Sequence, residues 1–166
     1  MPKISAKPEK NVYYRCRENL GLTREKASEL LEWISADRLE KIENERVAAP
    51  TPSEVVKMSE VYNAPDLCNY YCSHQCEIGA KYVPEVKIKD LAQIVLEMLA
   101  TLNSVGERKN RLIEITADGE ITDDEIADFM EIQKELERIS ITVESLQLWS
   151  EKMIADGKIS KEKLGK

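Results

Sequence analysis

Apolar residues up to about residue 76 recur at helical spacing, in short groups separated by residues that end helices. Val12, Cys16 and Leu20 are four residues apart and line one face of a first helix, which Gly21 ends. Four more short helices are expected after it. Their inward residues are Ala27, Leu30 and Leu31 in the second, Leu39 and Ile42 in the third, Val55, Val56, Met58 and Val61 in the fourth, and Leu67 in the fifth. The pattern predicts a compact all-α unit.

Capping residues mark the starts of these helices. The candidates are Thr23 for the second helix, Ser35 for the third, Thr51 or Ser53 for the fourth, and Pro65 in the first turn of the fifth. Residues 22–46 therefore contain two short helices joined by a tight turn. This is the layout of a helix-turn-helix, whose second helix enters the major groove of DNA.

From residue 88 onward the apolar residues follow alternating steps of three and four. The first series is Ile88, Leu91, Val95, Met98, Leu102, Val105 and Leu112, with Lys109 as its one break. The second series is Phe129, Ile132, Leu136, Ile139, Val143, Leu146 and Met153. Between them, Ala117-Asp118-Gly119 ends one helix, and Thr122 with Glu125 predicts a capping box for the next. Two helices of about 28 and 34 residues predict a long antiparallel hairpin, a coiled coil.

Seven large residues lie off this seam and need another partner. They are Ile94, Leu99, Ile113, Ile126, Met130, Leu148 and Trp149. We therefore expect a homodimer in which two hairpins form a four-helix bundle. The expected organisation is a flexible basic arm (1–10), a helix-turn-helix DNA-binding domain (11–79), a linker (80–87), the dimerising antiparallel helical hairpin (88–159) and a frayed tail (160–166).

Composition narrows the class of protein. Charged residues make up 33% of the 166 residues and aromatic residues only 5%, which suits exposed helices better than a β-sandwich. No basic start with an apolar run and no run of 18 apolar residues is present, so we expect no signal peptide, no membrane partner and a cytoplasmic location. The net charge of −7 argues against bulk attraction to nucleic acid. However, residues 1–24 carry six basic and only two acidic groups.

Residues 11–79 resemble the lambda-repressor-like helix-turn-helix family, the Cro, phage-repressor and XRE type of bacterial and phage transcriptional regulators. The matching residues are Arg17, Gly21, Leu22, Thr23, Ala27, Leu31, Ile34, Leu39, Ile42-Glu43-Asn44, Pro50, Met58-Ser59-Glu60-Val61-Tyr62 and Pro65. The resemblance implies a five-helix DNA-binding domain in which Ala27 is small because the third helix crosses close to it. It also implies that Glu43 fixes the end of the recognition helix, together with Arg17.

The resemblance also implies a set of DNA contacts. Thr23 and Arg24 would touch phosphate, Ser35, Ala36, Arg38 and Lys41 would face base edges or backbone, Asn44 and Arg46 would contact phosphate, and Lys3, Lys7 and Lys10 would follow the backbone. The alternative for each of these residues is a solvated surface position. Two features depart from the family: Glu45 stands where Gly is usual, and Asp37, Glu40 and Glu43 make the recognition helix acidic.

Three of the four cysteines and the only histidine, His74, fall within residues 68–76. In a helix, positions 68, 72 and 76 share a face, and Cys16 lies on the helix that packs against it in this fold. A metal site of Cys16, Cys68, Cys72 and Cys76, or of three thiolates with His74, would suit zinc or an iron–sulfur cluster. The spacing lacks the usual C-x2-C knuckle, so reduced core cysteines without a cofactor and a redox-switch disulfide are the alternatives.

The sequence thus predicts a sequence-specific transcriptional regulator that binds double-stranded DNA as a homodimer. The alternative is a protein–protein interaction adaptor that keeps the helix-turn-helix fold with weak or no DNA binding, because acidic side chains are repelled by phosphate. An enzyme is not expected, because His74 is the only histidine and no arrangement for nucleophilic catalysis is recognisable.

Overall fold

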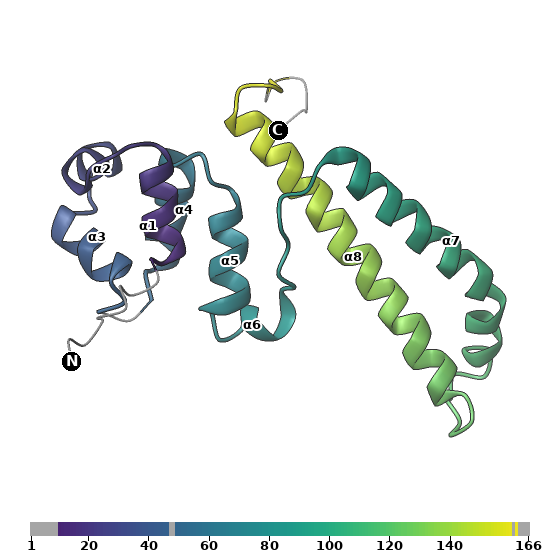
Figure 1. Cartoon of the computed structure of the whole chain (residues 1–166). Coiled ribbons are helices and arrows are strands. Elements are labelled where there is room, and N and C mark those ends of the chain that lie inside the picture. Colours follow the sequence, from purple (N-terminus) through teal and green to yellow (C-terminus); the bar gives the residue numbers. More distant parts are fainter. Residues whose placement is uncertain (1–9, 47–48, 161, 163–166) are drawn as a thin grey trace, which may run out of the picture. The chain divides into compact units, whose positions relative to one another are not determined.

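The computed structural model of the chain describes residues 10–46, 49–160 and 162. Within these residues the chain forms eight α-helices and no strand (Figure 1), which confirms the predicted all-α class. It divides into two units. The N-terminal unit runs to Val83 and includes Ala155–Lys158, and the long-helix unit contains Pro84–Ile154 and continues from Ile159. Lys3 and Lys7 of the predicted arm, and most of the predicted tail, lie outside the described residues.

Six short helices make up the N-terminal unit. They are α1 (Val12–Asn19), α2 (Arg24–Leu31), α3 (Ala36–Glu43), α4 (Pro52–Val61), α5 (Asp66–His74) and α6 (Gly79–Tyr82). The side chains of Thr23, Ser35 and Thr51 each accept a hydrogen bond from the backbone N–H three residues later, as the capping pattern predicts. The fourth helix is capped by Thr51, and Glu54 completes a capping box by accepting the N–H of Thr51 at 2.7 Å.

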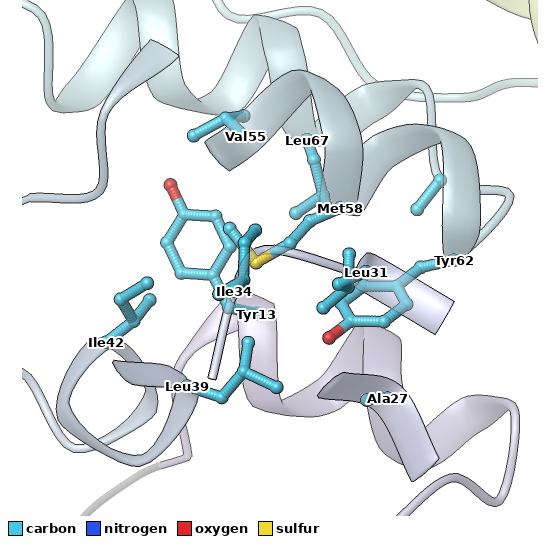
Figure 2. Packing of buried hydrophobic residues seen from close by; sticks show 11 residues of the cluster. Tyr13, Ala27, Leu31, Ile34, Leu39, Ile42, Val55, Met58, Tyr62 and Leu67 are labelled. Atoms are coloured by element: carbon cyan, nitrogen blue, oxygen red, sulfur yellow. The ribbon is translucent and has the colours of Figure 1, made fainter. Parts of the chain in front are cut away.

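Eleven buried residues form the core of the N-terminal unit, and ten of them are labelled in Figure 2. They are Tyr13, Ala27, Leu31, Ile34, Leu39, Ile42, Val55, Met58, Tyr62, Ala64 and Leu67. Figure 2 shows Leu39, Ile34 and Met58 converging on the Tyr13 ring, while Ala27 lies close to the backbone of its helix. The predicted inward residues of α3 and α5 are all in this core.

Three residues predicted to face the core are exposed instead: Leu20, Leu30 and Val56. On α1 the fully buried side chains are Tyr13 and Arg17, whereas Val12 and Cys16 pack at the edge of the core. Counting apolar residues missed the buried face of α1 because one of its members is charged. A buried charge requires a partner, and that partner comes from elsewhere in the chain.

Part of the predicted joint between the units is helical, since α6 begins at Gly79. A Cβ atom at Gly79 would lie 2.2 Å from the carbonyl oxygen of Cys72 and 2.8 Å from its carbonyl carbon, both backbone atoms of α5. Side-chain rotation cannot relieve such a clash. Glycine is therefore required here because α6 approaches the α5 backbone closely, and not because a helix ends at this residue.

The long-helix unit consists mainly of α7 (Leu91–Ile115) and α8 (Ile126–Ala155), of 25 and 30 residues. Asp90 caps α7 by accepting the N–H of Gln93 at 2.9 Å, so this helix starts later than the predicted residue 88. Two ion pairs join the helices: Arg108 with Glu131, and Arg111 with Asp128 at 2.7 Å. The chain turns back between the two helices in Figure 1. None of the helices that the structure describes combines the length and apolar character needed to cross a membrane.

The buried face of α7 differs from the predicted seam. At alternate seam positions, the buried residue is the neighbour of the residue that was predicted. Ile94, Thr101 and Ile115 are buried, whereas the predicted Leu91, Val95 and Leu102 are exposed. The seam therefore includes a threonine, whose hydroxyl donates to its own helix at the Glu97 carbonyl oxygen, 2.8 Å away. An apolar count overlooks such a position.

The residues predicted to lie off the seam include both buried and exposed ones. Ile94 and Leu148, predicted to need an outside partner, are buried within the chain, so that prediction was wrong for these two. In contrast, Leu99, Ile113, Ile126 and Met130 are exposed, as expected for residues left off the intrachain seam.

Candidate nucleic-acid interface

The turn between α2 and α3 has an unusual backbone. Glu32 has φ 65° and ψ −66°, and the N–H of Trp33 donates to the carbonyl oxygen of Leu31 at 2.8 Å. This is a γ-turn with positive φ, the rarer and more strained of the two forms. Ser35 then caps α3 by accepting the N–H of Arg38 at 3.2 Å. The chain thus reverses sharply within a few residues, which is the local requirement of a helix-turn-helix.

A buried ionic cluster holds the C-terminal end of α3. The Glu43 side chain is 1% exposed and accepts two hydrogen bonds from Arg17, from Nε at 2.6 Å and from Nη2 at 2.9 Å. Arg24 adds a third from its Nε at 2.8 Å. Hydrogen bonding to Glu43 raises the pKa of the Arg17 guanidinium, against the opposing effect of burial. The position of α3 is therefore fixed by α1 and α2 together, as the family resemblance implies for Glu43 and Arg17.

The cap at the end of α3 explains the departure at Glu45. The N–H of Arg46 donates to the carbonyl oxygen of Lys41 at 3.0 Å, and the N–H of Glu45 donates to that of Ile42 at 3.2 Å. These are the two hydrogen bonds of a Schellman motif. Glu45 accordingly has φ 54°, a left-handed conformation that glycine adopts more easily, which is why glycine is expected at this position.

The side chains on the outer face of α3 are mixed in charge. Ser35, Lys41 and Asn44 are exposed, and Ala36 is half-buried. Lys41 lies 2.6 Å from Asp37 one turn earlier, and Arg46 lies 3.4 Å from Glu40. These pairs are exposed and break readily, because solvent screens them. A phosphate or a base edge can therefore compete for either cation.

Arg38 and Arg24, by contrast, are held by buried carboxylates. Arg38 makes a two-point contact with Glu54, from Nε at 2.6 Å and Nη2 at 2.8 Å, and the Glu54 side chain is 8% exposed. This contact lowers the pKa of Glu54. Arg24 retains partial exposure beside Glu43. Two of the predicted DNA contacts thus serve first to connect helices.

Two residues that position the interface were missed from the sequence. Glu54 was detectable, because Thr51-x-x-Glu54 is a capping-box pattern, but its link to Arg38 was not. Asn11 caps α1 by accepting the N–H of Tyr14 at 3.1 Å and donates through Nδ2 to the Ile42 carbonyl oxygen at 2.8 Å. Its side chain therefore ties the start of α1 to the end of α3.

The remaining predicted contacts lie at the starts of α1 and α2. Thr23 is exposed, and its hydroxyl oxygen accepts the N–H of Lys26 at 3.3 Å. Lys10, the part of the predicted arm that is described, contacts Tyr14, with Nζ 2.5 Å from the phenol oxygen and 4.0 Å from the ring centroid. The N-terminus of α2 leaves backbone N–H groups that suit an anion.

All four cysteines are reduced, outside any disulfide, and half-buried. Among the described residues, which include all four cysteines and His74, no group of three or more potential ligands is placed to hold a metal ion. Cys16 and Cys68 pack against the core, and Cys76 Sγ accepts the N–H of Gly79 at 3.4 Å. Burial raises the pKa of Cys72, which disfavours its thiolate. Cys16 and Cys68 thus contribute to the packing around the core of the N-terminal unit.

His74 lies away from a shared ligand position. Its ring stacks on that of Tyr70, with centroids 4.5 Å apart, and its Nδ1 is 3.1 Å from the Tyr70 carbonyl oxygen. The Tyr70 ring in turn contacts Tyr13 edge to face, at 6.3 Å between centroids. His74 therefore extends an aromatic row that runs from the core to the surface of α5.

Comparison with known proteins gives one match. A family model described as a helix-turn-helix domain matches residues 15–67, from α1 to the first turn of α5. No curated protein and no solved structure matches the chain. The matched segment contains the buried ionic cluster, the γ-turn and α3, so the chain carries a helix-turn-helix domain of the kind that binds DNA.

Proposed function

We propose that this protein is a sequence-specific DNA-binding transcriptional regulator that acts as a homodimer. The observation that carries the proposal is the arrangement of α3 within the matched domain. Buried groups hold this helix at its end, through Glu43, while Ser35, Lys41 and Asn44 stay exposed along it. A rigid helix with exposed polar side chains is what major-groove recognition needs.

Dimerisation would compensate for the modest DNA affinity of a single domain. The basic side chains near α3 face nearby carboxylates, so the affinity of a single domain for DNA is expected to be modest. Two linked domains bind two half-sites with a gain in effective concentration. We assign dimerisation to the hairpin of α7 and α8. The antiparallel arrangement of these two helices is supported by the opposite order of their ion pairs, Arg108 with Glu131 and Arg111 with Asp128. We propose a cytoplasmic location, as expected for a bacterial or phage regulator that acts on DNA.

Selection from random-sequence DNA at low salt, followed by gel-shift titration, tests DNA recognition. Lys41→Ala and Arg46→Ala are each expected to weaken binding about tenfold. Lys134→Ala removes an exposed positive charge from α8 and serves as the matched control, with no expected change. Failure to enrich any sequence, or an equal loss in the control, would contradict sequence-specific binding by α3.

A second candidate is a protein–protein adaptor that keeps the fold but binds DNA weakly. The pairing of Arg24, Arg38, Lys41 and Arg46 with carboxylates favours it. A defined protein partner that binds equally well after Arg38→Ala and Lys41→Ala, together with no DNA retention at low salt, would establish this alternative.

A further inference from the structure

Helix α7 has an apolar face that its own chain leaves exposed. We call this face the outward stripe, which consists of Ala92, Val95, Leu99, Leu102, Gly106, Lys109 and Ile113. The exposed fractions are 42% at Val95, 53% at Leu99, 48% at Leu102 and 56% at Ile113. Its steps alternate between three and four residues, which is the spacing of helices that pair along their length.

The outward stripe is distinct from the face that α7 buries within the chain. The intrachain face contains Ile94, Thr101 and Ile115. Ile94 and Thr101 directly precede the stripe residues Val95 and Leu102. One residue corresponds to a rotation of about 100° around a helix, so the two faces adjoin without coinciding. Helix α7 can therefore contact α8 and a further helix simultaneously.

The outward surface of helix α8 is more often interrupted by polar residues. Its outward residues Ile126, Met130, Leu136 and Val143 are exposed, but Gln133, Ser140 and Gln147 lie between or beside them. Polar groups buried in a helix pair without partners lower its stability. The longer uninterrupted apolar surface of the long-helix unit, from Ala92 to Gly106, thus belongs to α7.

We propose that the outward stripe of α7 binds the same stripe of a second copy of this chain, with the two α7 helices antiparallel. The inference rests on the proposed homodimer and identifies the surface that forms it. A two-fold interface requires a surface that complements itself. With the two-fold axis midway between Leu99 and Leu102, Leu99 lies against Leu102 of the partner subunit, and Val95 lies against Gly106 of the partner subunit.

Shape supports this register. A Cβ atom at Gly106 would meet nothing within 4 Å, so the position is an open notch on the surface of α7. The antiparallel register places the Val95 side chain of one copy over the notch of the other. Leucines thus meet leucines at the centre of the interface. On either side, a valine fills the space left by a glycine, as close packing between helices requires.

Charge selects the antiparallel direction. Lys109 is the one charged residue of the outward stripe. In a parallel pair, Lys109 would face Lys109 of the partner subunit, which is repulsive. In the antiparallel register it lies against Ala92 of the partner subunit, where no second lysine of the stripe faces it. The same residue therefore opposes the parallel orientation and is tolerated in the antiparallel one.

Sedimentation equilibrium of the full chain tests the surface. Leu99→Asp with Leu102→Asp is expected to raise the dimer dissociation constant at least about 100-fold, because carboxylates would be buried at the interface. Leu136→Asp makes the same change at a similarly exposed leucine of α8 (45%) and should leave the dimer intact. Unchanged helical circular dichroism would show that each variant is folded. A monomeric wild type, or dissociation by Leu136→Asp alone, overturns the proposal.

Disulfide trapping tests the direction. The double variant Val95→Cys with Gly106→Cys is expected to form a covalent dimer, with the bond between positions 95 and 106 identified by peptide mass spectrometry. Val95→Cys alone should not cross-link to itself, because 11 residues of helix separate the two copies by about 16 Å along the axis, beyond the reach of a disulfide. An efficient disulfide between position 95 of the two copies in the Val95→Cys variant would indicate a parallel pair and overturn the proposed orientation.

The proposed interface and the proposed DNA binding can fail independently, because oligomeric state and DNA binding are measured in separate experiments. A wild-type dimer that depends on Leu99 and Leu102 supports the α7 interface even where no DNA is retained, in which case only the proposed function fails. A wild-type monomer that binds DNA refutes the interface and leaves the DNA-binding function standing.

Discussion

The N-terminal unit and the long-helix unit satisfy their buried polar groups in different ways. In the N-terminal unit, Arg17 and Glu43 are 26 residues apart in sequence and bond to each other across two helices. In the long-helix unit, the buried hydroxyls of Thr101, Thr142 and Ser145 each donate to a carbonyl oxygen four residues earlier in the same helix.

This difference has a structural consequence. A buried ion pair between helices is satisfied in one arrangement only, so it specifies how the helices of the N-terminal unit meet. A hydroxyl bonded to its own helix is satisfied in any arrangement, and it leaves the choice of neighbour to apolar packing. Apolar contacts therefore select the neighbours of the helices in the long-helix unit, whereas buried ion pairs specify the arrangement of helices in the N-terminal unit.

The largest expected effect is that of breaking the ionic cluster. Glu43→Ala should reduce the free energy of unfolding by about 3–5 kcal/mol, because Arg17 remains buried without its counter-charge. The measurement is the urea midpoint at constant slope. Glu18→Ala is the matched control, since Glu18 also approaches Arg17, at 3.4 Å, but is exposed, and it should cost less than about 1 kcal/mol. Equal losses would show that burial does not matter here.

The next effect probes the long-helix unit. Ile94→Ala is expected to cost about 2–4 kcal/mol, since Ile94 is fully buried and its loss leaves a cavity. Ile126→Ala removes the same atoms from an exposed site and should change stability by less than about 0.5 kcal/mol. Thermal unfolding followed by circular dichroism distinguishes them, and similar losses would mean that this unit has no internal core of its own.

A smaller, opposite effect is expected at the γ-turn. Glu32→Gly should stabilise the N-terminal unit by about 1 kcal/mol, because glycine relieves the positive φ and the lost contact with Lys57 is largely exposed. Glu29→Gly, in the exposed part of α2, should instead destabilise by about 1 kcal/mol. The sign of the difference between these two variants tests whether the turn is strained.

The smallest effect concerns pH. Hydrogen bonding to Arg38 lowers the pKa of Glu54 from its ordinary value of 4.5, so its ionised form stabilises the folded state above that pH. This stabilisation is lost as the pH falls through the lowered pKa. Glu54→Gln should therefore cost about 1 kcal/mol at pH 7 and progressively less as the pH falls below 4.5. A difference from wild type that stays constant down to pH 3 would contradict this role.

The sequence predicted local features of the fold well. Thr23, Ser35 and Thr51 cap the helices that they were expected to cap. The all-α class and the helix-turn-helix segment also follow from the sequence, because capping and helical periodicity depend on residues three or four positions apart. For the candidate site, the sequence identified the exposed Ser35, Lys41 and Asn44 on the outer face of α3.

What required the tertiary structure involves partners distant in sequence. The Arg38–Glu54 contact spans 16 residues, and no local sequence pattern predicts it. The requirement for glycine at position 79 depends on the backbone of α5. The buried face of α7 could not be chosen from apolar residues alone, because two adjacent faces of that helix are both apolar and the α8 neighbour decides between them.

By itself, then, the sequence determined where the helices of this protein start, that they include a helix-turn-helix, and that its long helices carry more apolar surface than one seam can bury. Only the tertiary structure decided which cations face inward toward carboxylates and which face of α7 is left outward. The physical reason is the range of the interactions. Caps and periodicity act within one helical turn, whereas burying a charge or choosing between two apolar faces depends on a group that another part of the fold brings into contact.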